Sequence, residues 1–135
     1  MLKRTVSVFI VAWWLTQSAT VLALQDQHDR CMAATDGVTV AMLDCLAVAV
    51  DEADAALEIL QDKLLPSVNS ELETKLHVAH EEWAAYRAST CQAEAAAAGS
   101  GSFSNGAFID CHLRITWERL KWLERLSENP DLIDE

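Results

Sequence analysis

Four cysteines in a short chain constrain the fold of this protein more than any other feature. Cys31, Cys45, Cys91 and Cys111 are the only cysteines among 135 residues, and no two of them form a C-x-x-C pair. Zinc sites normally use such close pairs, whereas an even number of well-separated cysteines in an exported protein is typical of disulfides. We therefore expect two disulfides, for which three pairings are possible.

The N-terminus has the layout of a secretory signal peptide. Lys3 and Arg4 form a basic head, an apolar run follows, and Val21 and Ala23 suit the positions just before a cleavage site. A retained membrane anchor is the alternative, but the apolar run is short for a span and polar residues interrupt it. We expect cleavage of residues 1–23, which would release residues 24–135 as a single periplasmic or secreted domain without a membrane anchor.

The exported part is strongly acidic. Loss of Lys3 and Arg4 leaves 8 basic residues against 21 acidic ones, a formal net charge of −13. Nucleic acids and anionic membranes bind basic surfaces, so neither is an expected partner. A cationic partner would be attracted and its encounter accelerated, although the same charge can also serve solubility alone.

Apolar residues recur at steps of three or four along three segments, which predicts three helices. The first begins near residues 35–39 and ends at Pro66. The second begins at a capping-box pattern formed by Ser70 and Glu73 and ends near residue 97. The third extends from about Ala107 to the Asn129-Pro130 pair. Residues 25–38 are expected to form an irregular leader, and the Gly/Ser-rich residues 99–106 a loop.

These segments predict an all-α fold, a small up-down-up three-helix bundle stapled by two disulfides after a cleaved signal peptide. In this arrangement Cys45, Cys91 and Cys111 lie near one end of the bundle, and the leader can bring Cys31 to the same end. We favour the pairs Cys31–Cys45 and Cys91–Cys111, although the sequence leaves all three pairings open. Each favoured pair would contribute about 3 kcal/mol in chain-entropy models.

Two pairs of residues at helical spacing are expected to hold the helices together. Trp83 and Tyr86 fall on the apolar stripe of the second helix, and Arg87 beside them is expected to reach a carboxylate on another helix. Thr116 and Arg119 lie one turn apart on the third helix. A backbone hydrogen bond from the threonine and an ion pair from the arginine are the favoured roles, and direct contact with a partner is the alternative.

The stretches "AHEEWAAYRASTC" and "CHLRITWERLKWL", separated by a Gly-Ser segment, resemble the LprI-type lysozyme-inhibitor-like family of exported proteins. "ADAAL" and the first two cysteines match that family's pattern upstream. The chain departs from the pattern at four positions, which carry Glu58, Gln61, His80 and Ala88. The matching residues in the two stretches are Ala79, Trp83, Tyr86, Arg87, Cys91, Gly99, Ser100, Cys111, Thr116, Arg119 and Leu123.

The resemblance implies an envelope protein that binds a protein partner and inhibits a cationic lysozyme-type peptidoglycan hydrolase. In that hypothesis the predicted loop blocks the hydrolase cleft through Gly99, Ser100, Phe103 and Asn105. Trp117 is a further candidate contact, unless the leader covers it. The alternative is an accessory envelope or immunity protein that neutralises another exported partner, such as a toxin.

The sequence contains no pattern that indicates an enzyme or a cofactor. Its acidic residues are scattered over helix surfaces, no G-x-S-x-G motif occurs, and cysteines in disulfides cannot act as nucleophiles. His77 and His80 lie one turn apart and could bind a transition metal. A metal-binding protein is therefore a third hypothesis, but a complete set of ligands is not evident.

Overall fold

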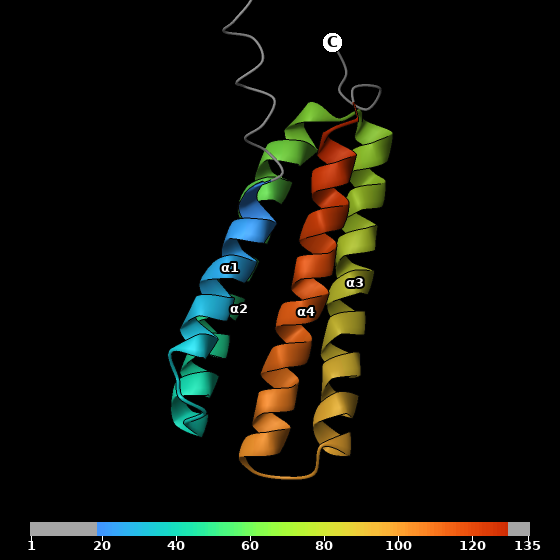
Figure 1. Ribbon diagram of the computed structural model, residues 1–135. Coiled ribbons are helices and arrows are strands. Elements are labelled where there is room, and N and C mark those ends of the chain that lie inside the picture. The colour runs from blue at the N-terminus through green and yellow to red at the C-terminus, as the bar shows by residue number, and fades with distance from the viewer. Residues whose placement is uncertain (1–18, 130–135) are drawn as a thin grey trace, which may run out of the picture.

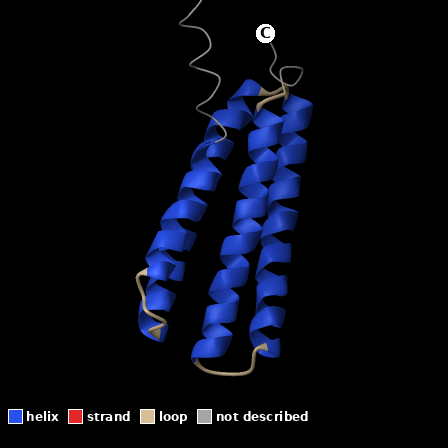
Figure 2. Cartoon of the chain, in the orientation of Figure 1, coloured by secondary structure: helices blue, strands red, loops and turns tan. Residues whose placement is uncertain are grey.

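A computed structural model describes residues 19–129 as a bundle of helices, with no strand in that range (Figures 1 and 2). The elements are α1 (Ala19–Ala33), α2 (Thr39–Leu64), the short 3-10 helix η1 (Leu65–Ser67), α3 (Ser70–Ala97) and α4 (Ser102–Ser127). Successive α-helices run in opposite directions (Figure 1). None of the described helices is both long enough and apolar enough to span a membrane. Most of the predicted signal peptide, residues 1–18, lies outside the described residues.

The three predicted helices are confirmed as α2, α3 and α4, and α4 is the central one. Both α2 and α3 pack on α4, but no Cα atom of α2 lies within 8 Å of a Cα atom of α3. The main core is formed by the predicted apolar stripes, and its buried members on α2 and α4 are Leu46, Ala49, Ala53, Leu57, Leu64, Leu113, Leu120 and Leu123. Side chains alone therefore bridge the space between α2 and α3.

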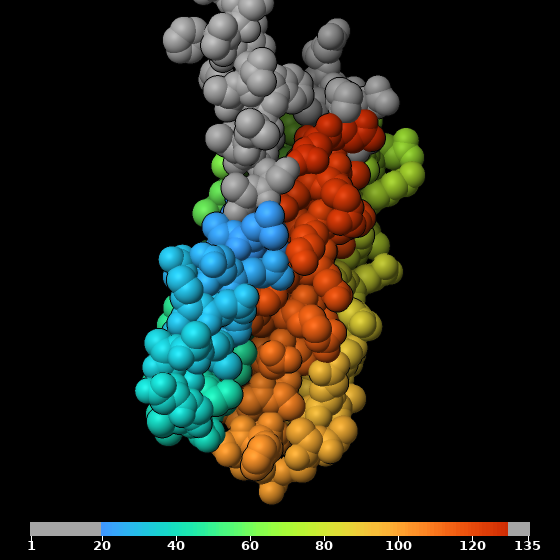
Figure 3. All heavy atoms as spheres, in the orientation of Figure 1, coloured from blue at the N-terminus to red at the C-terminus, as the bar shows by residue number. Residues whose placement is uncertain are grey.

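The prediction of an irregular leader was wrong, because residues 25–33 belong to α1. This fourth helix packs along α2 and also touches α4 (Figure 3). Two of its side chains face the core: Val21, which is 2% exposed, and Leu24, which packs against the same core. This helix was not predicted because its inward-facing apolar residues lie at the predicted cleavage site. That site, after Ala23, falls inside α1.

Local chemistry accounts for where α2 and α3 end and begin. Pro66 lies in η1 and ends α2, as predicted. The cap of α3 is Asn69, whose Oδ1 accepts a hydrogen bond from the Leu72 N–H at 2.9 Å. The predicted capping box at Ser70 and Glu73 was therefore displaced by one residue, since Ser70 is already helical.

Candidate functional site

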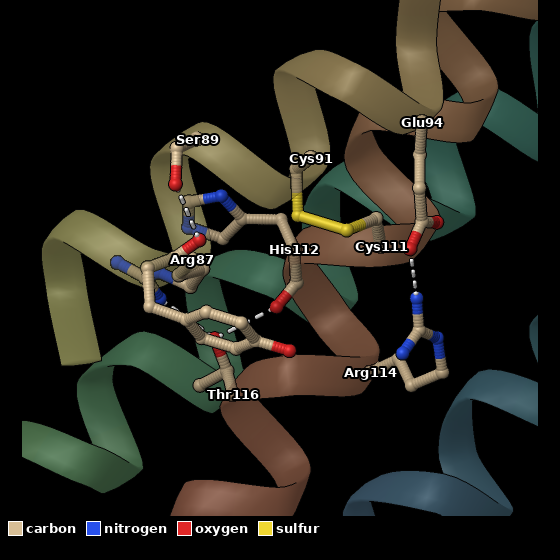
Figure 4. Close-up of a disulfide and its surroundings, with 9 residues drawn as sticks. Arg87, Ser89, Cys91, Glu94, Cys111, His112, Arg114 and Thr116 are labelled. Carbon is tan, nitrogen blue, oxygen red and sulfur yellow. Dashed lines mark hydrogen bonds and ion pairs between the residues drawn. A yellow bond between two sulfur atoms is a disulfide. The ribbon is translucent and has the colours of Figure 1, made fainter. Parts of the chain in front are cut away.

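Both disulfides lie toward the same end of the bundle, and the pairing is the favoured one. Cys31 is bonded to Cys45, and Cys91 to Cys111, with Cα–Cα distances of 5.8 and 5.4 Å. The first bond joins α1 to α2, and the second joins α3 to α4 (Figure 4). Cys91 and Cys111 are fully buried and pack with Ile115, Trp83 and Phe108 in a second core cluster. At this end of the molecule, covalent bonds therefore join the helices in two pairs, α1 with α2 and α3 with α4.

The connection between α3 and α4 is shorter than predicted. Residues 102–106 form the start of α4, so the expected loop over 99–106 was wrong beyond Gly101. Gly99 and Gly101 have φ values of 101° and 70°, which glycine adopts without strain, and this reverses the chain in a few residues. The Ser104 Oγ also donates a hydrogen bond to the Ala95 carbonyl at 3.0 Å, which ties the two helices together.

This α3–α4 tip, defined as residues 98–106, carries four of the five predicted partner contacts. Phe103 is 81% exposed, more than any other large hydrophobic side chain among the described residues. Gly99, Ser100 and Asn105 are exposed beside it in sequence. The Ser104 hydrogen bond and, farther along the two helices, the Cys91–Cys111 bond tie the helix end that carries Phe103 to α3.

The fifth predicted contact, Trp117, is not at the tip. It lies on α4, half-buried, and its ring meets His28 of α1 edge-on with centroids 5.6 Å apart. Its Nε1 atom is buried. The leader, now seen as α1, therefore covers Trp117 in part, which matches the alternative considered from the sequence.

Arg87 joins three helices through one nitrogen. Its Nη1 donates to the Asp54 Oδ1 on α2 at 2.6 Å and to the Thr116 Oγ1 on α4 at 2.7 Å. The Thr116 hydroxyl donates to the His112 carbonyl at 2.9 Å (Figure 4). The carboxylate expected for Arg87 and the backbone bond expected for Thr116 are both present. Helical spacing alone could not identify Asp54, although it belongs to the "ADAAL" match.

Arg119 differs from the prediction, because it forms no ion pair with any described residue. Its guanidinium lies 4.3 Å from the ring centroid of Trp122 and 5.6 Å from that of Trp83. The Nε and Nη2 atoms are buried without a hydrogen-bond partner, and burial lowers the pKa of Arg119 from its usual value. The two tryptophan faces stabilise the charge partly, but they use none of its N–H groups.

Trp83 and Tyr86 were both predicted to face the core, and only Trp83 does. Trp83 packs against both core clusters, and Arg87 lies 4.4 Å above its ring. Tyr86 is 57% exposed. A step of three residues along a helix is less than a full turn, so Tyr86 points in a different direction from Trp83. This angular difference is enough to move Tyr86 out of the narrow contact between α3 and α4.

A small cavity lies between α2, α3 and α4, toward the end away from the disulfides. Its volume is about 210 Å³, and Gln61, His80 and Arg119 are among the residues that line it. The Gln61 Nε2 and the His80 Nδ1 are 2.6 Å apart and form a hydrogen bond. Both residues are departures from the family pattern, and in this chain they contact one another. Burial lowers the pKa of His80, and the charges of Arg119 and Arg87 lower it further.

The histidines do not form a metal site in the part of the chain that is described. No group of three or more His, Cys, Asp or Glu side chains in residues 19–129 is arranged to hold an ion. His77 lies 3.9 Å from Glu73 on its own helix, whereas His80 is engaged with Gln61.

Comparison with known proteins agrees with the resemblance seen in the sequence. The profile of the family described as "Lysozyme inhibitor LprI" matches residues 31–123. That range covers more than half of the chain, both disulfides, the tip and the Arg87 network. Searches of the curated proteins and of the solved structures gave no match. The chain belongs to the LprI lysozyme inhibitor family.

Proposed function

We propose that this protein is exported and inhibits a cationic lysozyme-type peptidoglycan hydrolase by inserting the α3–α4 tip into its substrate cleft. Membership of the LprI family supports an inhibitor with a protein partner. The observation that carries the rest is the exposure of Phe103, at 81%, on a helix end tied to its neighbour by a disulfide. Exposed aromatic side chains on rigid supports are typical centres of protein interfaces.

The charge of the protein suits such a partner. A net charge of −13 after loss of residues 1–23 would attract a basic hydrolase and accelerate its association. Salt screens this attraction, because the Debye length is already only about 8 Å at physiological ionic strength and shortens further as salt is added. Steering by charge and blocking by the tip are separate contributions, and the first depends on salt more strongly than the second.

Lysis of a bacterial substrate by lysozyme tests the proposal. The purified protein is titrated from equimolar to a large molar excess, at low and at moderate salt. Inhibition that approaches completeness, with a faster onset at low salt, is expected. Undiminished lysis at the largest excess would contradict the proposal and favour the alternative, an accessory or immunity protein for a different exported partner.

A further inference from the structure

The cavity between α2, α3 and α4 combines two features that are unusual in so acidic a protein: a half-buried arginine and no carboxylate among the described residues paired with it. Arg119 lines the cavity of about 210 Å³ and forms no ion pair with any residue from 19 to 129. Two of its nitrogen atoms are buried without a hydrogen-bond partner. A buried charge without a partner is costly, so such a group normally has a counter-ion when the protein functions.

The cavity also has room for a ligand. Its volume is several times the roughly 30 Å³ that a water molecule occupies in the liquid. Leu64, Leu76 and Leu123 supply apolar walls, while Gln61, His77 and His80 supply polar groups. This mixture of apolar walls with a few polar groups is typical of sites for small molecules.

The cavity is lined by the cationic side chain of Arg119 despite the negative overall charge of the protein. Burial lowers the pKa of His80, and the charges of Arg119 and Arg87 lower it further, while Glu81 raises it. Asp54 is already paired with Arg87. Asp62 is the one acidic residue among those that line the cavity, and its side chain is exposed.

We propose that this cavity binds a small carboxylate, with Arg119 as the counter-ion and the leucines enclosing its apolar part. A carboxylate oxygen is a strong acceptor for a guanidinium N–H, and Nη1 is the one guanidinium nitrogen of Arg119 that is not among its buried, unpartnered atoms. The faces of Trp83 and Trp122 hold that guanidinium in place. The site is distinct from the tip and does not depend on inhibition of a hydrolase.

Thermal unfolding with sodium propionate, sodium phosphate and sodium chloride at equal ionic strength tests the proposal. Propionate is expected to raise the Tm of the wild type by roughly 2 °C or more over chloride, because a ligand that binds only the folded state stabilises it. Arg119→Met should abolish this rise, whereas Arg125→Met, which changes an exposed arginine on the same helix, should retain it. No rise in the wild type, an equal rise in Arg119→Met, or an equal rise with phosphate would overturn the assignment.

A second measurement needs no variant. In a propionate titration followed by NMR, the indole N–H signals of Trp83 and Trp122 should shift in a saturable way. Trp117, which lies against α1, should not respond. Equal, non-saturating shifts of all three signals would overturn the proposal, since they would indicate a general effect of the anion.

Discussion

Arg87 on α3 and Asp54 on α2 meet across the space between two helices that have no Cα atoms within 8 Å of each other. Their Nη1–Oδ1 distance is 2.6 Å, and the arginine side chain is 16% exposed. The same nitrogen reaches Thr116 on α4. This ion pair is therefore a principal link between α2 and α3, at mid-height in the bundle, and it complements the disulfides near one end.

Replacing Asp54 by alanine tests the importance of this link. The change leaves the mostly buried Arg87 without its carboxylate, and we expect a loss of about 2 kcal/mol in the free energy of unfolding. The estimate is below that for a fully buried pair because Asp54 is 40% exposed. Urea unfolding followed by circular dichroism measures it. Asp62→Ala, on the exposed side of α2, is the control and should change stability by less than about 0.5 kcal/mol; equal losses in the two variants would refute the link.

The two disulfides should differ in how fast they are reduced. Cys31 is exposed, whereas Cys91 and Cys111 are fully buried. A thiolate must reach the sulfur it attacks, so the Cys31–Cys45 bond should open first under native conditions. Timed alkylation after addition of dithiothreitol, followed by peptide mapping, identifies the order. Earlier labelling of Cys91 and Cys111 would contradict the packing described for the second core cluster.

His112 should make the protein less stable at mildly acidic pH. Burial lowers the pKa of His112 below 6.5, and the Arg87 charge lowers it further, while Asp54 opposes this with a smaller effect. Between the lowered pKa and about 6.5 the unfolded chain binds more protons than the folded chain. The stability that neutral His112 provides is therefore complete above this window and is lost as the pH falls through it.

His112→Gln should accordingly reduce the difference in unfolding free energy between pH 7.5 and pH 5.5. His80 is retained in that variant, and because burial also lowers its pKa, part of the difference should remain. His77→Gln, which alters a side chain that is 60% exposed, is the matched control and should show the wild-type difference. If His112→Gln showed the full wild-type difference, the assignment to His112 would be wrong.

The position of Val21 predicts the effect of removing the first turn of α1. Val21 is 2% exposed in the main core, and full burial of a valine contributes about 1.5 kcal/mol or more. A protein that begins at Leu24 should therefore unfold at a lower urea concentration than one that begins at Ala19. Val21→Ala in the longer protein should show an intermediate loss. Equal midpoints for the two lengths would mean that this turn contributes nothing to the fold.

Most of the architecture could be predicted because α2 and α4 carry wide apolar stripes. Periodicity at Leu46, Ala53 and Leu57 is unambiguous, and the ends of the helices then place the cysteines together. α1 could not be predicted in this way, since a short helix with two inward apolar residues has almost no periodic signal. Its stability comes from packing and from the Cys31–Cys45 bond, both of which are tertiary.

The polar part of the structure was predicted less completely. The sequence indicated that Arg87 needs an acid, but 18 acidic residues in the described region made the choice of Asp54 impossible from spacing. For Arg119 the same reasoning failed, because its guanidinium packs on tryptophan faces and pairs with no carboxylate of the described residues. Residues 102–106 resemble a loop in composition, yet they are helical. The Gly101 carbonyl accepts a hydrogen bond from the Asn105 N–H, and the Ser104 hydroxyl ties this first turn to α3.

The proposal that the α3–α4 tip blocks the hydrolase cleft is tested most directly by comparing two exposed aromatic side chains in the lysozyme inhibition assay. Phe103 lies on the tip and Tyr86 lies on the outer side of α3, and neither substitution by alanine should disturb the core. Phe103→Ala should raise the half-inhibitory concentration at least about tenfold, as expected for an interface residue worth 1.4 kcal/mol or more. Tyr86→Ala should stay within about twofold of the wild type, by the same scale. Full potency in Phe103→Ala, or a large loss confined to Tyr86→Ala, would contradict the account.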